Sequence, residues 1–162
     1  MKEIKLTKNK ISLIDDEDFE KVSKYKWHCL ANNYAARKFY YEKKDGKWIT
    51  KYIRLHQFIL NEFNKEIDHV NGNRLDNRKE NLRLCTRSLN NANSIKKTRK
   101  GGTTSKYKGV TWNKNASKWM VQAKLDNIGY YLGLFTDEIE AAKAYNKKAK
   151  ELFGDFARLN QL

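Results

Sequence analysis

The sequence predicts an α+β protein made of two small units, and three observations indicate this fold class. At 162 residues the chain suits one ordinary domain or two small ones. Its apolar residues form short β-prone runs with few helical repeats. A basic, glycine-containing stretch separates two halves with different patterns. We therefore predict a first domain at residues 1–94, a basic linker at 95–106 and a second domain at 107–162.

The elements of the first domain follow from short apolar runs between turn-forming residues. A hairpin is expected from Ile4–Leu6 and Ile11–Ile14, followed by a short helix at Asp16–Tyr25. Three further strands are expected at Trp27–Leu30, Tyr34–Tyr41 and Trp48–Leu55, and a helical turn at His56–Phe63. The predicted helix is acidic at its start and basic at its end.

A strand, a loop, a second strand and a helix are expected at about residues 66–94, the most polar part of the chain. Asp68–His69 closes the first strand, and Asn71–Gly72 is a strong turn signal. Leu82–Cys85 has the pattern of the second strand, and Thr86 is placed to cap the helix. The sequence thus predicts a compact ββα core within the first domain.

The second domain is expected to be a three-stranded antiparallel sheet packed on one helix. Its strands are predicted at Tyr107–Trp112, Lys118–Lys124 and Gly129–Phe135, with Thr136 as helix N-cap and Gly154 as the helix end. Apolar residues at helical spacing form the face expected to cover the sheet: Ile139, Ala142, Tyr145, Ala149, Leu152 and Phe153. The other face of the sheet is left available for binding.

The charge of the chain restricts its partners. With 34 Lys and Arg against 19 Asp and Glu, the net charge is +15 and the pI is about 9.7. The 40% of apolar residues can build a core, which excludes a disordered basic tail. No apolar run is long enough to span a membrane, and the N-terminus lacks the apolar segment of a secretory signal. We expect a soluble intracellular protein whose partner is a polyanion, namely nucleic acid.

The adjacent carboxylate and imidazole of Asp68 and His69 suit hydrolysis of a phosphodiester bond, which needs a base for water and a cation near the phosphate. Histidine titrates near neutral pH and can act as the base. A carboxylate with an amide carbonyl offers the hard oxygen ligands that Mg²⁺ prefers. Cys29 and Cys85 have no paired spacing, so neither a disulfide framework nor a structural zinc ion is expected.

The run DHVNGNRLDNRKENLRLCTRSLN resembles the HNH endonuclease motif, the ββα-metal core found in phage and intron homing endonucleases, and the resemblance covers about residues 50–94. It implies that His69 is the general base and that Asp68 binds a divalent metal ion, Mg²⁺ or alternatively Mn²⁺. Asn81 matches the middle Asn of the motif and would hold the imidazole of His69 through its carbonyl. Asn90 matches the third position, in the following helix, and would be the second metal ligand.

Other asparagines compete for two of these roles. Asn77 can be mistaken for the middle position held by Asn81, although turn formation explains its presence without catalysis. Asn91 and Asn93 lie close to Asn90 and replace it if the register of the helix differs. Both alternatives stay open at the level of the sequence.

The histidines differ in their expected roles. Strict strand alternation would turn Asp68 and His69 to opposite faces, so the strand must end or twist at His69 for both to act. Taken alone, His69 would suit an ordinary half-buried histidine equally well. His56 precedes a short helix and is a candidate phosphate contact near the active site, with a structural hydrogen bond as the alternative. His28 is expected to be structural.

The second domain resembles the AP2/ERF DNA-binding domain from Tyr107 to Asn160, through YKGV, KWMVQAK, YLGLF, EAAKAY and GDFARLN. That family lays its three-stranded sheet into the DNA major groove. The resemblance implies that one face of the sheet contacts DNA through Lys108, Thr111, Trp119, Gln122, Lys124 and Tyr131, while Lys114 and Lys118 meet phosphates. The basic linker is expected to add phosphate contacts through Lys96, Lys97, Arg99 and Lys100.

The side chains on this sheet depart from the plant pattern of the family. Positions that are usually arginine hold Lys108, Thr111, Lys124 and Gly129, so the bidentate contact of arginine with guanine is missing. We therefore expect a different and weaker sequence preference. The face toward the helix is assigned to Val110, Val121 and Leu132. A slip of one residue in a strand would exchange the two faces, and Trp119 and Tyr131 would then pack the sheet.

The function expected from both resemblances is metal-dependent cleavage of double-stranded DNA, targeted by the second domain and typical of phage or mobile-element homing nucleases. Such an enzyme acts as a monomer or as a homodimer on DNA. It is expected in the cytoplasm of a bacterial or phage-infected cell, associated with the nucleoid. A non-catalytic DNA-binding regulator and an RNA-directed HNH enzyme are the alternatives.

Overall fold

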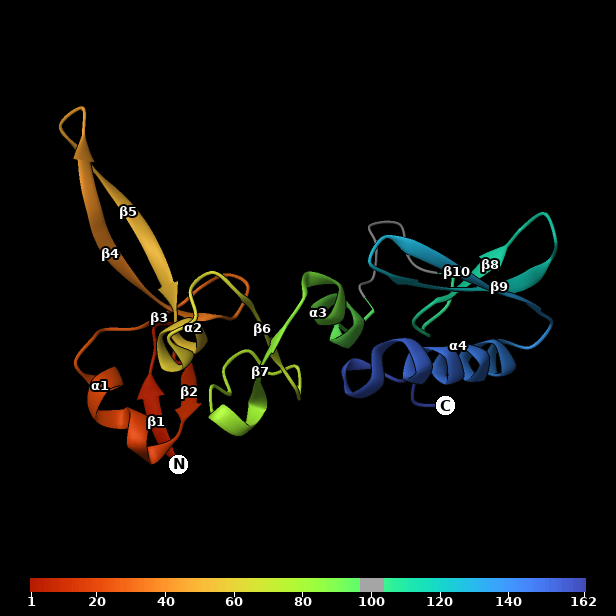
Figure 1. The fold of residues 1–162 in the computed structure, drawn as a ribbon, viewed down its shortest axis with the longest axis horizontal. Coiled ribbons are helices and arrows are strands. Elements are labelled where there is room, and N and C mark those ends of the chain that lie inside the picture. Colours follow the sequence, from red (N-terminus) through yellow and green to blue (C-terminus); the bar gives the residue numbers. More distant parts are fainter. Residues whose placement is uncertain (97–103) are drawn as a thin grey trace. The chain divides into compact units, whose positions relative to one another are not determined.

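The computed structural model describes residues 1–96 and 104–162, which form two compact units, Met1–Cys85 (unit 1) and Thr86–Leu162 (unit 2) (Figure 1). Both units are mixed α/β structures with small antiparallel sheets. The predicted linker residues Lys97, Arg99 and Lys100 lie outside the described residues. Within the described part of the chain, no helix combines the length and the apolar character that crossing a membrane requires.

Unit 1 begins with the strand pair β1 (Lys2–Lys5) and β2 (Ile11–Ile14), which are antiparallel. The single helix predicted next is divided into a 3₁₀ turn, η1 (Asp16–Asp18), and the short helix α1 (Phe19–Ser23). Alternate residues of the strand pair point into the core: Ile14 is fully buried with Val22 of α1. This strand pair therefore contributes one side of the hydrophobic core of unit 1.

A three-stranded sheet follows, ordered β3 (His28–Cys29), β4 (Ala35–Lys44) and β5 (Lys47–Arg54). The turn between β4 and β5 is Asp45–Gly46, and both residues have positive φ, as a two-residue hairpin turn of this type requires. Figure 1 shows β4 and β5 extending beyond the other elements of unit 1 as a long hairpin. The helix α2 (Leu55–Leu60) follows directly and ends at a left-handed residue, Asn61.

The predicted ββ core is present as β6 (Glu66–His69) paired antiparallel with β7 (Leu82–Cys85). The loop between these strands contains a 3₁₀ turn, η2 (Lys79–Asn81). The loop is attached to the β1–β2 strand pair, because the Leu13 N–H of β2 donates to the Leu75 carbonyl and the Leu13 carbonyl accepts the Asn77 N–H. Residues far apart in the sequence are thereby brought together around His69.

The helix predicted after β7 is α3 (Arg87–Asn93), and Thr86 caps it by accepting a hydrogen bond from the Leu89 N–H. The division between the compact units nevertheless lies before α3, whereas the sequence assigned residues up to 94 to the first domain. The reason is apolar packing: Leu89 and Ala92 join the hydrophobic core of unit 2. Local helix signals place α3 correctly but do not tell which core it joins.

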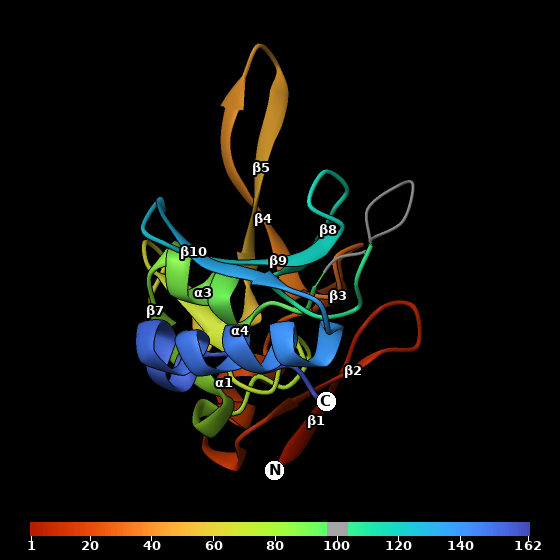
Figure 2. The same ribbon diagram turned by 90° about the vertical axis from the view of Figure 1, so that its right-hand side faces the viewer.

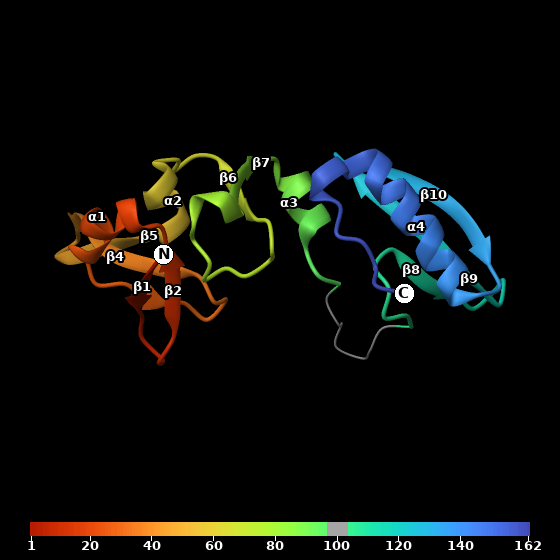
Figure 3. The ribbon, with the colours of Figure 1, turned by 90° about the horizontal axis from the view of Figure 1, so that it is seen from below.

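Unit 2 contains the sheet β8 (Val110–Asn113), β9 (Lys118–Leu125) and β10 (Ile128–Phe135), with β9 in the centre. Helix α4 (Glu138–Phe153) lies along one face of the sheet (Figures 2 and 3) and is followed by the 3₁₀ turn η3 (Gly154–Phe156). The prediction of Thr136 as the N-cap is wrong, because the Asp137 carboxylate accepts the Glu140 N–H at 2.8 Å.

The core of unit 2 differs from the prediction at the first turn of α4. Ile139 is exposed and Ala141 is fully buried in its place, beside Ala142 and Tyr145. The buried face of α4 is centred on Ala142, Tyr145 and Ala149, and Ile139 lies at the edge of that face, where its side chain meets solvent. Gly109 explains how closely α4 approaches β8, since a Cβ at this position would lie 2.0 Å from the Tyr145 ring.

Candidate active site

The strand β6 places Asp68 and His69 next to each other and on opposite faces of the strand pair. Asp68 is paired with Arg83 across the ladder and His69 with Leu82. The strand ends at His69, and its carbonyl accepts the Gly72 N–H of the turn at 2.8 Å. Both residues are only 4% exposed, so the fold of unit 1 controls the chemistry of their side chains.

The imidazole of His69 is held by Asn77. The Nε2 atom of His69 lies 3.3 Å from Oδ1 of Asn77, while Nδ2 of Asn77 donates to Ser12 Oγ at 2.8 Å. Because an amide oxygen can only accept, Nε2 carries the proton and donates it to Asn77. The basic nitrogen of the neutral ring is therefore Nδ1.

Asn81 has a different role from the one predicted. Its Oδ1 accepts the Asn71 N–H at 2.9 Å, and its Nδ2 donates to the Asp76 carbonyl at 2.8 Å. The first contact joins the two ends of the β6–β7 loop, and the second attaches the middle of the loop to its end. The assignment of the imidazole contact to Asn81 is thus wrong: the loop brings Asn77 to the ring and Asn81 supports that loop.

Asp68 forms a buried ion pair with Arg83. The Nε and terminal N–H groups of Arg83 donate to Oδ2 of Asp68 at 2.9 and 2.7 Å. The two side chains are 5% and 19% exposed. Because buried charges need such compensation, Arg83 explains how a carboxylate is tolerated here.

The predicted metal ligands, Asp68 and Asn90, are both among the residues that the structure describes. No group of three or more His, Cys, Asp and Glu side chains there is arranged to hold a metal ion. The donor chemistry of one carboxylate and one amide carbonyl does fit a Mg²⁺ ion that keeps most of its water ligands. Asn90, the second predicted ligand, lies on α3, together with the competing Asn91 and Asn93, and belongs to unit 2.

His56 lies directly against His69. Their ring centres are 5.0 Å apart, and the Tyr34 ring lies 5.3 Å from His56 and 5.9 Å from His69. Burial, together with His69 and Arg54, lowers the pKa of His56 to about 3. At neutral pH His56 is therefore an uncharged, buried ring of the active site.

The pKa of His69 is also lowered, mainly by burial. The hydrogen bond to Asn77 and the nearby carboxylates of Asp68 and Asp76 oppose this shift. A pKa below the ordinary value of 6.5 leaves the imidazole neutral at physiological pH. The ring is thus in the form that accepts a proton.

Unit 2 presents the surface predicted to bind DNA. Along β9, Val121 and Ala123 are buried toward α4, so Gln122 and Lys124 point to the opposite face. Three more predicted residues lie on this open face. Lys118 alternates with Gln122 along β9, while Thr111 is paired with Met120 and Tyr131 with Gln122 across the strands. Lys114 is exposed in the turn before β9.

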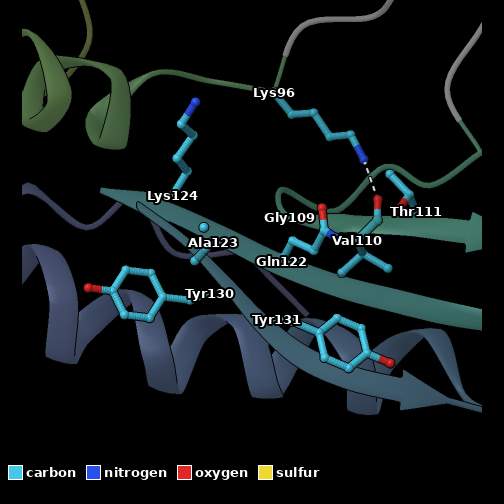
Figure 4. Close-up of a pocket in the computed structure, with 10 residues that line it drawn as sticks. Lys96, Gly109, Val110, Thr111, Gln122, Ala123, Lys124, Tyr130 and Tyr131 are labelled. Carbon is cyan, nitrogen blue, oxygen red and sulfur yellow. Dashed lines mark hydrogen bonds between the residues drawn. The ribbon is translucent and has the colours of Figure 1, made fainter. Parts of the chain in front are cut away.

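Figure 4 shows a shallow hollow of about 500 Å³ over part of this sheet, lined by Lys96, Thr111, Gln122, Lys124 and Tyr131 among others. Lys124 points away from α4, whereas Tyr130 points toward it. Leu132, assigned to the helix side, is the unpaired residue of a bulge between Tyr131 and Gly133 and packs partly against the core.

Two predicted DNA contacts, Trp119 and Lys108, have structural roles instead. Trp119 lies on the same face as Val121, packs against the core and stacks edge-to-face on Trp112 at 4.9 Å. The Lys108 ammonium donates to three backbone carbonyls at the end of α3, those of Asn91, Ala92 and Ser94. Burial lowers the pKa of Lys108 to about 8. These contacts contradict the assignment of Trp119 and Lys108 to the open DNA face.

Lys96 is likewise engaged with protein. Its ammonium donates to the Tyr107 and Val110 carbonyls at 2.6 and 2.8 Å, and the second bond is drawn in Figure 4. The assignment of Lys96 to a linker that contacts DNA is therefore wrong in this structure. As with Lys108, backbone carbonyls of unit 2 accept the N–H groups of the ammonium, which is thereby held against the protein.

Sequence reasoning missed two features around His69. Ser12 and Asn77 are 65 residues apart, and no local pattern connects them. The Arg54 and Arg74 guanidinium groups lie 5.1 and 4.7 Å from the centre of the Tyr34 ring, which itself borders both histidines. The sequence offered one indication of the role of Arg54, since this basic residue stands near the end of the predicted strand Trp48–Leu55.

A neutral, oriented imidazole beside a buried carboxylate on a strand pair is an arrangement that can activate water for hydrolysis. Residues 62–92 match the family model described as HNH endonuclease. The chain is also 30% identical over 148 residues to an uncharacterized HNH endonuclease of Acanthamoeba polyphaga mimivirus, covering 87% of this chain and 70% of that protein. No solved structure shows a significant match.

The chain therefore belongs to the HNH endonuclease family. The prediction of an HNH-family DNA endonuclease, a hydrolase, is confirmed. Because unit 1 ends at Cys85, a match over 87% of the chain also includes part of unit 2. HNH nucleases generally use a divalent metal ion.

Proposed function

We propose that this protein is a metal-dependent endonuclease that hydrolyses phosphodiester bonds of duplex DNA, with His69 as its general base. The hydrogen bond from His69 Nε2 to Asn77 is the observation that carries the proposal. It leaves Nδ1 as the basic nitrogen, and burial keeps the ring neutral. A general base positioned in this way contributes about 10²–10⁴-fold to a hydrolytic rate.

In this proposal His69 Nδ1 accepts a proton from the water molecule that attacks phosphorus. Asn77 accepts the Nε2–H throughout and prevents the ring from rotating, in the way that a third residue orients the base of a catalytic triad. Asp68 and Asn90, the ligands that the resemblance implies, would hold the divalent ion, for which Mg²⁺ is proposed and Mn²⁺ is an alternative. When bound, this ion polarises the phosphate and stabilises the charge that develops on the leaving oxygen.

Unit 2 is proposed to target the enzyme as an AP2-like domain, through the open face of its sheet. Thr111, Gln122, Lys124 and Tyr131 share that face, and the exposed Lys114 and Lys118 are proposed to meet phosphates. Contacts of this kind make binding strongly dependent on salt. A tether to a sequence-preferring unit raises the local concentration of the nuclease at its target.

The biological setting is proposed from the same features. A targeted HNH nuclease of this size suits a phage or mobile element, and its place of action is the nucleoid of a bacterial or infected cell. A monomer with one site would nick one strand, whereas two subunits on a palindromic site would break both.

The decisive experiment is incubation of the purified chain with supercoiled plasmid, with Mg²⁺, with Mn²⁺ and with EDTA. We expect metal-dependent nicking that is lost in His69→Ala, while His28→Ala keeps it. Duplex binding in EDTA should be the same for all three proteins. Binding without cleavage by the wild-type protein in any metal ion would instead favour a non-catalytic DNA-binding regulator.

A further inference from the structure

The long hairpin of β4 and β5 carries a basic surface that neither the motif nor unit 2 explains. Its twenty positions, 35–54, hold seven Lys and Arg residues against two acidic ones, Glu42 and Asp45. Its strands have ten and eight residues. At a rise of about 3.4 Å per residue the hairpin is about 27–34 Å long, close to one turn of B-DNA.

One face of this hairpin combines aromatic and basic side chains. Lys38 is paired with Tyr52 across the strands and Lys43 with Trp48, so all four side chains lie on the same face. Trp48 and Tyr52 are 59% and 54% exposed. An exposed aromatic ring offers a flat surface on which a base or sugar can stack, and a neighbouring lysine can meet the adjacent phosphate.

The same face leads to the candidate active site. Arg54 follows Tyr52 by two positions on β5 and therefore continues the face toward α2. Its guanidinium lies 5.1 Å from the centre of the Tyr34 ring, and that ring lies 5.9 Å from the His69 ring. A polymer bound along the hairpin would thus reach His69 without leaving unit 1.

We propose that the face of the β4–β5 hairpin formed by Lys38, Lys43, Trp48, Tyr52 and Arg54 (the hairpin face) binds the groove of duplex DNA and delivers the phosphodiester to His69. The major groove of B-DNA accepts a two-stranded β-ribbon. Lysines on the face neutralise phosphates, and the two aromatic rings contact sugars and base edges. The inference rests on the proposed function, since it assumes that duplex DNA is the substrate.

The opposite face of the same hairpin supplies a charge-matched control. Lys44 and Lys47 are paired with each other, and both side chains are exposed. One double variant, Lys38→Gln with Lys43→Gln, removes two positive charges from the hairpin face. The control variant, Lys44→Gln with Lys47→Gln, removes the same charge from the opposite face. A third variant, Trp48→Ala with Tyr52→Ala, removes the aromatic rings and leaves the charge unchanged.

The experiment measures the affinity of each full-length protein for a labelled 30-base-pair duplex in EDTA, as a function of salt, with thermal melting to verify folding. We expect the hairpin-face lysine variant to bind at least tenfold more weakly, and its slope of log K against log salt to fall by about 1.8. The aromatic variant should also lose about tenfold. The control pair should lose less than threefold.

Equal losses for the two lysine pairs would overturn the proposal, because net charge alone would then explain binding. Unchanged affinity in both hairpin-face variants, or a loss seen only with single-stranded DNA or RNA, would also overturn it. Failure of the wild-type protein to cut plasmid in any metal would reject the proposed function, yet a face-specific loss of duplex binding would still support the hairpin face.

Discussion

The Nε2 atom of His69 lies 3.3 Å from Oδ1 of Asn77, eight residues further along the chain. The amide of Asn77 is itself oriented by Ser12, whose hydroxyl donates to the Leu75 carbonyl and accepts from Asn77 Nδ2, both at 2.8 Å. A chain of hydrogen bonds from β2 therefore determines which nitrogen of His69 carries the proton. The proposed base depends on packing between segments that are distant in the sequence.

Replacement of Asn77 tests this relationship directly. Asn77→Ala removes the acceptor for Nε2–H, and we expect the rate of plasmid nicking at saturating DNA to fall about 10²-fold. The pH dependence of the remaining rate should also change, because the hydrogen bond raises the pKa of His69.

Asn81→Ala is the matched comparison for Asn77→Ala. It removes two hydrogen bonds that close the loop, so we expect it to lower the free energy of unfolding by about 1–3 kcal/mol. The pH profile of cleavage by the folded fraction should stay unchanged. A changed profile in Asn81→Ala alone would return the imidazole contact to Asn81.

Removal of Arg83 should destabilise unit 1 strongly. Arg83→Ala leaves the Asp68 carboxylate buried without its ion-pair partner, which costs about 3 kcal/mol in comparable buried pairs. Urea unfolding monitored by tryptophan fluorescence measures this loss. Lys65→Ala breaks the more exposed Lys65–Glu62 pair and should cost less than about 1 kcal/mol; similar losses in both variants would contradict a buried role for Arg83.

Stability should fall in mild acid because of His56. Its pKa is about 3 in the folded protein against 6.5 ordinarily, so the folded state favours the neutral ring. Between these pH values the unfolded chain binds a proton that the folded chain does not. Stability is therefore fully present above pH 6.5 and decreases by up to about 1.4 kcal/mol per pH unit below it.

Urea unfolding between pH 7.5 and pH 4.5 measures the contribution of His56. His56→Phe keeps an aromatic ring beside Tyr34 and His69 and removes the titrating group, so its stability should depend less steeply on pH. An identical pH dependence in the two proteins would show that His56 is not held neutral.

The approach of α4 to β8 should tolerate no side chain at residue 109. Gly109→Ala introduces a Cβ that would lie 2.0 Å from Cδ2 of Tyr145, at a residue with φ of +77°. We expect a loss of about 3 kcal/mol or more in unit 2, measured by thermal unfolding. Gly129→Ala, with open space around its Cβ, should cost less than about 1 kcal/mol; a tolerated Gly109→Ala would contradict the packing described.

Lys108 should contribute to stability and not to DNA binding. Lys108→Met removes the ammonium from three carbonyls at the end of α3, and we expect a loss of about 2 kcal/mol. The affinity of the folded variant for duplex DNA should stay within about twofold of wild type. Lys106→Met, at an exposed lysine near the Tyr107 ring, is the control for loss of charge; a larger loss of affinity in Lys108→Met would restore the predicted DNA contact.

The local pattern of the sequence was sufficient for most elements. The strand Leu82–Cys85 is predicted at its observed bounds, the helix capped by Thr86 at its observed start, and the strands of unit 2 within a few residues. Alternation of apolar residues along a strand is a local property, which explains this success. The helix cap is less well determined by local sequence: Thr136 and Asp137 both suit an N-cap, and in the structure the Asp137 side chain accepts the Glu140 N–H.

By itself the sequence determined that the chain carries an HNH motif with Asp68 and His69 at its centre, and that its charge suits nucleic acid. Only the tertiary structure decided between Asn77 and Asn81, because two asparagines in one loop have the same local chemistry. The contact with Ser12, 65 residues away, makes the distinction. Such contacts arise from packing of distant segments, which no periodicity in the sequence records.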